Sequence, residues 1–576
     1  MNPNKTPDLS YSRLVKQSKR IDGEKLSGKL KVALLSDAAS QQFVPVLRSL
    51  FADNGILATV YEGNFDAIEL EALDANSGLH EFAPDVVYVV NSAQALRARY
   101  YEHGIEPELP RIERVWDALA KNTGCRIVQC NFALPYERPF GQFDLKTGNS
   151  IYAATRSLNS QIAERAAHRP NILLCDVEAV ASHVGRREWF DDRLWDMSKT
   201  FCNLEHLPMV AQAMVDIALA GIGRLVKCVI CDLDNTMWGG VVGDTGPHGI
   251  QIGAHGEGEA FYRLQKFLAT LQRRGILLAV CSKNDKANAM APFEQNPEMV
   301  LKLSDFVMFV ANWDNKADNI RQIRDTLEIG FDSLVFLDDN PFERNLVRNF
   351  LPDVIVPELP DDPADYVRAI SELNLFETTA VSAEDLARAE LYKVEAQRRV
   401  AQATFTDVTE YLKSLQMRII LERFPAEKIA RISQLFARSN QFNLTTQRHT
   451  EAACTQMTQE ANTIPLCASL SDQFGDHGLI GIVVAQVEPD GLRLSDWLMS
   501  CRVLKRGVED YLMNHVVNLA RERGLRWIRG QYIPTSKNAM VKDFYAQFGF
   551  ETTDQLNWVL DTHAYLPREN FISAAV

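Results

Sequence analysis

Hydrophobic runs of strand length alternate with helix-length segments of mixed polarity over the first two thirds of the chain. A first series starts at Leu30 and ends near Leu225, with the runs KVALLSD, ATVYEG, DVVYVV, CRIVQC and NILLCD. A second series starts at Lys227, with KCVICDLD, ILLAVCS, DFVMFVAN and SLVFLDDN. Hydrophobic strands with helical spacers are typical of parallel sheets that helices cover on both faces. The pattern predicts an α/β fold with two successive doubly wound parallel-sheet domains.

The pattern changes after the acidic, proline-containing stretch 357–363, which has the composition of an element break. A charged helical segment follows, and from about Met417 strand-like runs such as MRIIL, HGLIGIVVAQV and RWIRGQYI lie among fewer helices. This mixture favours a third domain of the α+β class. The predicted division is an N-terminal extension at 1–29, α/β domains at 30–225 and 226–370, a helical connector at 371–415 and a mixed domain at 416–576.

Composition narrows the class of protein. The 576 residues carry a formal net charge of −14, whereas a protein that neutralises phosphate backbones needs a clustered basic surface. No stretch of about 18 apolar residues is present, and the N-terminus lacks a hydrophobic segment. The ten cysteines show no disulfide-scaffold spacing, which suits a reducing compartment. We expect a cytoplasmic protein without nucleic acid or membrane partners.

One pair of cysteines has the spacing of a possible metal site. Cys228 and Cys231 lie three positions apart within the hydrophobic run KCVICDL. Side chains alternate between the two faces of a strand, so these two are expected to point in opposite directions. We therefore interpret both as core residues and not as zinc ligands.

Polar side chains suited to phosphoryl chemistry follow the strands of the second series, where open α/β sheets place their ligands. Carboxylates can serve as nucleophile, proton donor and Mg²⁺ ligands, while a hydroxyl and an ammonium can bind phosphoryl oxygens. The candidates are Asp232, Asp234, Asp338 and Asp339, the hydroxyl of Ser282 and the ammonium of Lys316. Taken singly, each motif also permits a plain strand cap or turn.

The order D-x-D-x-T, strand-Ser, Lys, strand-Asp-Asp resembles the four-motif pattern of the haloacid dehalogenase superfamily, over about 227–357. The resemblance implies that Asp232 is the nucleophile and Asp234 the general acid and base. It implies a Mg²⁺ cofactor, held by Asp232, the backbone carbonyl of Asp234, and Asp339 with Asp338. The phosphate-binding residues that it implies are Thr236, Ser282, Asn284 and Lys316.

Two details narrow the resemblance further. The first motif continues as DNTMWGGVVGD, and the second reads CSKN around Ser282. In both respects the sequence resembles the FkbH-like branch, whose members take glyceryl units from 1,3-bisphosphoglycerate and load them onto acyl carrier proteins. That resemblance implies a small phosphorylated acyl donor and a separate acyl carrier protein as partners. Trp238 in the first motif is interpreted either as a cover of the site or as a core aromatic.

Cys281 is the candidate thiol for a thioester step. A thiolate can attack an acyl phosphate to give a thioester, and the neighbouring Lys283 and Lys316 are expected to lower the pKa of Cys281. The alternative is a buried strand cysteine that faces away from the pocket, because adjacent strand residues point oppositely.

The flanking domains resemble known folds more loosely. In layout the first resembles SGNH-type hydrolases, with Ser36, Asn91 and His206 as possible counterparts, although a structural role fits Ser36 and His206 better because local motifs are missing. The third domain resembles the GNAT acyltransferase fold without its usual pyrophosphate loop. A contact with a carrier's phosphopantetheine arm is predicted for Asn443, Arg506, Gly507 and Tyr545.

Three functions remain open from the sequence. The first is a glyceryl transferase and phosphatase that loads an acyl carrier protein. The second is a Mg²⁺-dependent small-molecule phosphatase without acyl transfer, which would need neither Cys281 nor the third domain. The third is a non-catalytic scaffold, which is expected to have lost at least one motif residue, although none is lost.

Overall fold

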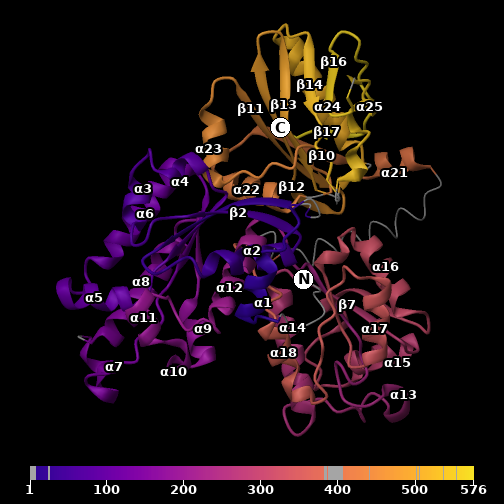
Figure 1. Cartoon of the computed structure of the whole chain (residues 1–576). Coiled ribbons are helices and arrows are strands. Elements are labelled where there is room, and N and C mark those ends of the chain that lie inside the picture. Colours follow the sequence, from indigo (N-terminus) through magenta and orange to yellow (C-terminus); the bar gives the residue numbers. More distant parts are fainter. Residues whose placement is uncertain are drawn as a thin grey trace. The chain divides into compact units, whose positions relative to one another are not determined.

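The computed structural model describes residues 8–575, except 24, 25, 27, 149, 382–385, 387–406, 440, 501, 502, 505, 536, 537 and 553. The chain forms two compact units. The first comprises residues up to Ile222 together with 448–455 and contains one β-sheet; the second comprises 223–447 and the residues from Gln456 on and contains two (Figure 1). Most of the predicted helical connector at 371–415 lies outside the described residues. None of the helices in the described part of the chain has the length and apolar character that a membrane span requires.

The first unit is built on a five-stranded parallel sheet with the order β2-β1-β3-β4-β5. Its strands are β1 (Gly28–Ser36), β2 (Ile56–Glu62), β3 (Val86–Val90), β4 (Arg126–Cys130) and β5 (Ile172–Cys175). Alternate residues of β3 enter two separate hydrophobic clusters, because Tyr88 packs on one face and Val87 on the other. Both faces are therefore buried, as expected for a parallel sheet.

Helices cover both faces of this sheet. Residues of α1, α2 and α12 enter the cluster that contains Tyr88, whereas residues of α6 and α8 enter the cluster that contains Val87. The helices are α1 (Tyr11–Ser18), α2 (Phe43–Asp53), α3 (Ile68–Leu73), α4 (Gly78–Phe82), α5 (Ala93–His103), α6 (Glu108–Thr123), α7 (Asp144–Thr147), α8 (Ile151–Ala167), α9 (Val177–Val184), α10 (Arg186–Trp189), α11 (Asp192–Ser198) and α12 (Leu207–Gly221).

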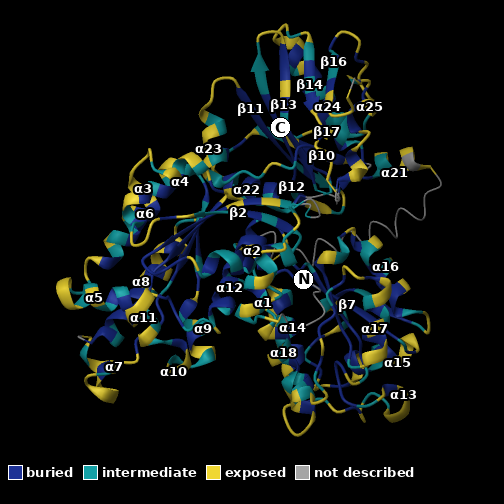
Figure 2. Ribbon diagram, in the orientation of Figure 1, coloured by how far each residue is buried: buried dark blue, intermediate teal, exposed yellow. Residues whose placement is uncertain are grey.

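The second unit begins with a four-stranded parallel sheet of order β8-β7-β6-β9. Its strands are β6 (Cys228–Cys231), β7 (Leu277–Ser282), β8 (Phe306–Ala311) and β9 (Leu334–Leu337), and its helices are α13 (Val242–Thr245), α14 (Gly258–Arg273), α15 (Lys286–Gln295), α16 (Lys316–Leu327), α17 (Pro341–Phe350) and α18 (Tyr366–Glu372). Cys228 and Cys231 enter different clusters on opposite faces, which confirms that they are core residues. Figure 2 shows β7 buried and α13 largely exposed.

The last sheet has eight strands in the order β15-β16-β14-β13-β12-β11-β10-β17 and mixes both strand orientations. The strands are β10 (Met417–Arg423), β11 (Thr463–Asp472), β12 (Gly475–Glu488), β13 (Gly491–Met499), β14 (Trp527–Gln531), β15 (Glu551–Thr552), β16 (Asn557–Asp561) and β17 (Ile572–Ala574). The helices are α21 (Val408–Ser414), α22 (Ile429–Arg438), α23 (Glu451–Gln459), α24 (Val508–Glu522) and α25 (Phe544–Gln547). Two parallel sheets followed by a mixed sheet confirm the predicted fold class, while the exact domain boundaries stay a prediction.

Strands β13 and β14 of this sheet diverge. They pair in parallel only from Gly491 to Leu494 on the β13 side. Beyond that point the segment 442–444 lies between them: Leu444 N donates to Trp497 O at 3.0 Å, and Ile533 N donates to Leu444 O at 2.8 Å. The chain's own backbone thus fills the gap between the two strands.

Candidate active site

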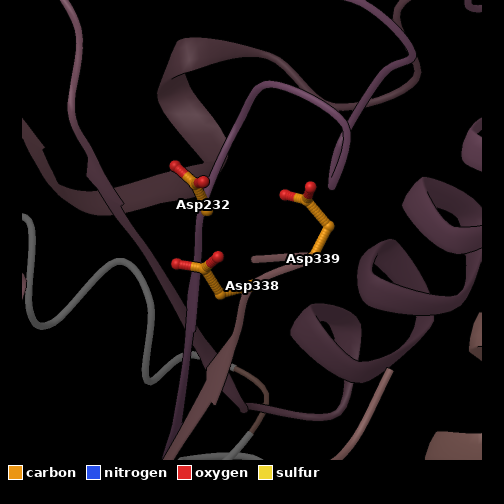
Figure 3. Close-up of side chains that lie close together, drawn as sticks. All are labelled: Asp232, Asp338 and Asp339. Carbon is orange, nitrogen blue, oxygen red and sulfur yellow. The ribbon is translucent and has the colours of Figure 1, made fainter. Parts of the chain in front are cut away.

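Two acidic motifs meet because β6 and β9 are adjacent parallel strands. Cys231 and Leu337 are register partners at the ends of these strands, and Asp232 N donates to Leu337 O at 2.9 Å. Asp232 therefore lies beside Asp338, and Figure 3 shows the carboxylates of Asp232, Asp338 and Asp339 close together. The predicted convergence of these motifs at the carboxyl end of the sheet is what the structure shows.

Lys316 joins the two acidic motifs. Its ammonium lies 2.9 Å from Oδ2 of Asp232 and 2.6 Å from Oδ2 of Asp338, and its side chain is only 3% exposed. Burial by itself lowers the pKa of Lys316, but the two carboxylates outweigh it and raise that pKa above its ordinary value. Lys316 is therefore a permanent positive charge at the base of the site.

Asp234 is held by three donors. Its Oδ1 accepts from Trp238 Nε1 at 2.9 Å and from Val242 N at 3.0 Å, while its Oδ2 accepts from Asn284 Nδ2 at 3.0 Å. Burial raises the pKa of Asp234, and the hydrogen bonds from Val242 and Trp238 oppose that rise. A raised pKa suits a general acid, since it favours the protonated form.

Thr236 and Asn284, both predicted to bind phosphate, contact carboxylates in the structure. Thr236 Oγ1 donates to Asp339 Oδ1 at 3.0 Å and accepts from Asp339 N at 3.0 Å, so its single proton is directed to Asp339. Asn284 donates to Asp234. Both side chains therefore orient acidic residues, and their phosphate-binding role stays a prediction.

The acidic cluster fits a divalent cation. One oxygen from each of Asp232, Asp338 and Asp339 lies within 4.8 Å of the others. Oδ1 of Asp232 is buried and has no hydrogen-bond partner among the residues that the structure describes. The two oxygens of Asp338 accept from Lys316 and from Asn340 N, so Asp232 and Asp339 have the freer ligand atoms. Hard carboxylate oxygens of this kind are the ligands that Mg²⁺ prefers.

Crowded negative charge raises the pKa values of the acidic cluster. Burial and the adjacent Asp232 carboxylate raise the pKa of Asp338 to about 7. The same two causes raise the pKa of Asp339. A cation placed among these oxygens stabilises their charged forms. The side chain of Asp234 is directed to Trp238, Val242 and Asn284 instead, so only its backbone carbonyl remains for the predicted metal role.

Ser282 and Cys281 end strand β7. Ser282 is a register partner of Ala311 and is 2% exposed, beside the end of β6. Cys281 points the other way: it is fully buried, packs with Ala279 and Ala317, and its Sγ lies 3.8 Å from Lys316 O.

The predicted lowering of the Cys281 pKa is wrong. Burial raises the pKa of this thiol to about 12, because desolvation outweighs the opposing charge of Lys316. Lys283 does not help, since its ammonium lies 2.6 Å from Oε1 of Glu343, and the Glu343 charge raises the Cys281 pKa further. The structure thus favours a buried thiol, but one that feels the charges of Lys316, Asp232 and Asp338 and is not turned away from them.

The residues predicted to contact a pantetheine arm are engaged within the third domain. Asn443 is 1% exposed and bonds to Ser439 O and Thr446 N. Arg506 is buried, with Nη1 3.4 Å from His477 Nε2. The other two residues are Gly507, with a φ of 82° before α24, and Tyr545, which packs on Phe550 and Trp558.

The start of α24 is also unsuited to an anion. A helix N-terminus favours negative groups, but Glu509 and Asp510 already occupy the first turn of α24. A pyrophosphate at Gly507 would meet the Asp510 carboxylate, whose Oδ2 lies 3.9 Å from the position of a Cβ at Gly507. This agrees with the absence of the usual pyrophosphate loop from the sequence.

Two of the hydrolase-like residues of the first domain, Ser36 and Asn91, make buried hydrogen bonds. Ser36 Oγ accepts from Ala38 N at 3.0 Å. Asn91 donates to Asp37 Oδ2 at 3.4 Å and accepts from Gln129 Nε2 at 2.8 Å. The bonds of Asn91 join the ends of β1, β3 and β4, whereas that of Ser36 is local, and a structural role fits both residues.

Sequence reasoning missed Arg344. It lies in α17, is 4% exposed, and donates from Nη1 to the carbonyls of Asp338 and Asp339 at 2.8 and 2.7 Å. Its segment, PFERNLVRNF, has the pattern of an ordinary amphipathic helix. No local sequence signal indicates that the Arg344 side chain contacts the preceding loop.

Sites of this construction belong to magnesium-dependent phosphatases of the haloacid dehalogenase type. Comparison with known proteins agrees. Residues 31–219 match the family model of the FkbH N-terminal domain. The N-terminal part of the protein BF1531 from Bacteroides fragilis, whose crystal structure contains a phosphatase domain complexed with Mg, is 37% identical, with a TM-score of 0.61. The match covers 64% of this chain and 99% of that one.

The chain therefore belongs to the FkbH-like family of the haloacid dehalogenase superfamily, and its cofactor is Mg²⁺. The ribosomal-protein-S18-alanine N-acetyltransferase of Escherichia coli is also similar, at 14% identity and a TM-score of 0.20 over 25% of this chain and 94% of that chain. No curated protein matches the sequence.

Proposed function

We propose that the chain takes a glyceryl unit from 1,3-bisphosphoglycerate, removes the remaining phosphate and loads the glyceryl group as a thioester onto a separate acyl carrier protein. Family membership supports the donor and the acceptor. The phosphoryl step rests on one observation above all: within the described part of the chain, Oδ1 of Asp232 is a buried carboxylate oxygen without a hydrogen-bond partner, next to Lys316. Such an oxygen is available as a nucleophile.

Removal of the phosphate follows from the two aspartates of the first motif. An Asp232 oxygen attacks phosphorus, the bond from phosphorus to the glyceryl oxygen breaks, and protonated Asp234 donates its proton to that oxygen. Water then attacks the aspartyl phosphate, Asp234 takes the proton, and phosphate leaves. Bound Mg²⁺ supplies charge compensation for the phosphoryl oxygens.

The thioester step needs a thiolate that attacks the acyl carbon of the donor. The carbon–sulfur bond forms, the bond from carbon to the phosphate oxygen breaks, and phosphate leaves with the electron pair. Cys281 was the predicted thiol, but its burial and its pKa of about 12 make it a poor nucleophile. We therefore assign the attack to the carrier's phosphopantetheine thiol, with Cys281 in the core beneath the site.

The test is a loading assay with Mg²⁺, 1,3-bisphosphoglycerate and a phosphopantetheinylated carrier, read by intact mass. The wild-type chain is expected to yield glyceryl carrier, whereas Asp232→Asn yields phosphoglyceryl carrier, because acyl transfer does not need the Asp232 nucleophile. Cys281→Ala retains loading. A transient acyl adduct on the wild-type chain that Cys281→Ala abolishes would return Cys281 to the mechanism.

The alternative functions give other results in the same assay. A phosphatase without acyl transfer releases phosphate from small esters and leaves the carrier mass unchanged. A scaffold does neither. Asp232, Asp234 and Lys316 are all retained. Lys316 is paired with Asp232, and Trp238 holds Asp234, which favours catalysis over the scaffold.

A further inference from the structure

Arg344 connects the metal cluster to the rest of its domain. The guanidinium uses Nη1 for the carbonyls of Asp338 and Asp339, at 2.8 and 2.7 Å, and uses Nε and Nη2 for Oε2 of Glu358, at 3.2 and 3.0 Å. The side chain is 5% exposed, whereas that of Glu358 is 54% exposed. One planar group thus joins the loop after β9 to the segment that carries Glu358.

We propose that Arg344 is a positioning residue of the magnesium site, which sets the directions of the Asp338 and Asp339 side chains through their backbone. Two successive carbonyls bonded to one nitrogen fix two neighbouring peptide planes. The Cα of Asp339 lies between those two planes, so they set the direction of its Cβ, while the Cα of Asp338 is fixed on one side, by the first plane. Mg²⁺ demands near-ideal octahedral geometry, so a small rotation of a carboxylate is costly.

The charge of Arg344 is balanced by Glu358. An uncompensated guanidinium near the acidic cluster would repel a divalent cation. Glu358 also pairs with Arg348, one helical turn further along α17, which holds the carboxylate in place. A lysine at 344 keeps the charge, but its single ammonium cannot reproduce the planar fork that serves both carbonyls and Glu358.

Arg348 provides a matched control. It lies on the same helix and pairs with the same glutamate, but its backbone acceptor is Val356 O, at 2.7 Å. Substitution there disturbs the Glu358 contact and leaves the carbonyls of Asp338 and Asp339 untouched. Any effect common to both variants therefore comes from Glu358, and an effect confined to Arg344 comes from the aspartate loop.

The experiment is a calorimetric Mg²⁺ titration of the full chain without substrate, on the wild type, Arg344→Lys and Arg348→Lys. We expect Arg344→Lys to weaken Mg²⁺ binding about 10- to 100-fold, the usual effect of losing an outer partner of a metal ligand, with Arg348→Lys close to the wild type. Hydrolysis of a phosphate ester by Arg344→Lys is expected to recover at saturating Mg²⁺. Mg²⁺ affinity equal to that of the wild type would overturn the proposal.

A second variant covers the case in which Arg344→Lys does not fold. Glu358→Gln leaves the arginine in place but removes its counter-charge and anchor, so Mg²⁺ binding is expected to weaken several-fold; unchanged binding overturns the proposal. The inference rests on the phosphatase half of the proposed function and not on the glyceryl donor. Failure of carrier loading with normal Mg²⁺ binding in the wild type contradicts only the proposed function.

Discussion

Trp238 Nε1 donates a hydrogen bond of 2.9 Å to Oδ1 of Asp234, while the indole ring is completely buried against Phe293 at a centroid distance of 5.5 Å. Of the two interpretations of Trp238, cover of the site or core aromatic, the structure favours the core aromatic. The ring packs in the core, and its nitrogen orients the predicted general acid.

Trp238→Phe is expected to lower kcat about tenfold. The substitution keeps an aromatic ring and removes one hydrogen bond to a carboxyl group, worth about 1.5 kcal/mol, and about 1.4 kcal/mol corresponds to a factor of ten in rate. Phosphate release from a small ester measures the effect. Trp558→Phe is the matched control, because Trp558 is also buried but its nitrogen has no hydrogen-bond partner among the described residues. Equal rates for the two variants would contradict the orienting role.

Lys316→Met is expected to destabilise the protein by about 3–5 kcal/mol, the usual result of leaving a buried charge without its partner. Asp232 and Asp338 then face each other without the ammonium between them. Urea unfolding measures the change in the free energy of unfolding. The double variant with Asp338→Asn is expected to recover part of the loss, and no recovery would indicate that the Asp338 charge is not its cause.

Asp339→Asn and Asp338→Asn are expected to differ in their effect on Mg²⁺. Both oxygens of Asp338 already accept hydrogen bonds, whereas Asp339 Oδ1 alone is engaged by Thr236. The stabilisation of the protein by Mg²⁺, measured as the rise in Tm, should therefore nearly vanish in Asp339→Asn and persist in Asp338→Asn. Chelation of Mg²⁺ should abolish phosphate release from the wild type. The reverse order of the two variants would make Asp338 the principal ligand.

Cys281 is expected to make stability fall with rising pH. Its pKa is raised by burial to about 12 in the folded protein, against about 8.5 for a free thiol. Below the lower value the thiol is neutral in both states and its contribution is fully present. Above that value only the unfolded state loses the proton, so the contribution is lost progressively up to the folded pKa. Urea unfolding between pH 8 and 10.5 should show a shallower decline for Cys281→Ala than for the wild type.

Alkylation gives an independent check on the same thiol. Native Cys281 should resist iodoacetamide at pH 8 and should react after unfolding, as read by peptide mass. Rapid modification of the native chain would show that the strand opens to solvent.

The strand-end motifs were predictable because parallel topology converts order along the chain into position in space. Hydrophobic runs before Asp232 and Asp338 sufficed to place both residues at one edge of a sheet. The roles of Thr236 and Asn284 were less accessible, because a motif gives the place of a side chain and not its hydrogen-bond partner. Each of them donates to a partly buried carboxylate, and the sequence alone does not show that this carboxylate is short of donors.

The environment of Cys281 was not predictable for a different reason. Two neighbouring lysines in the sequence suggested a lowered pKa, but desolvation depends on how closely α16 covers β7, which is a property of packing. Lys283 was also neutralised by Glu343, sixty positions later in the chain. Arg344 shows the same limit, since its acceptors are carbonyls, which carry no sequence signature.

The three carboxylates and the Lys316 ammonium together have consequences for the order in which the site fills. When all four groups are charged, the ammonium neutralises one of the three carboxylates and a net charge of two negative units remains. One Mg²⁺ neutralises both. A phosphate ester, itself an anion, meets a repulsive site before the cation arrives and a neutral one afterwards. The phosphatase should therefore follow an ordered scheme, with the cation bound before the substrate, and its apparent affinity for the ester should depend on the Mg²⁺ concentration.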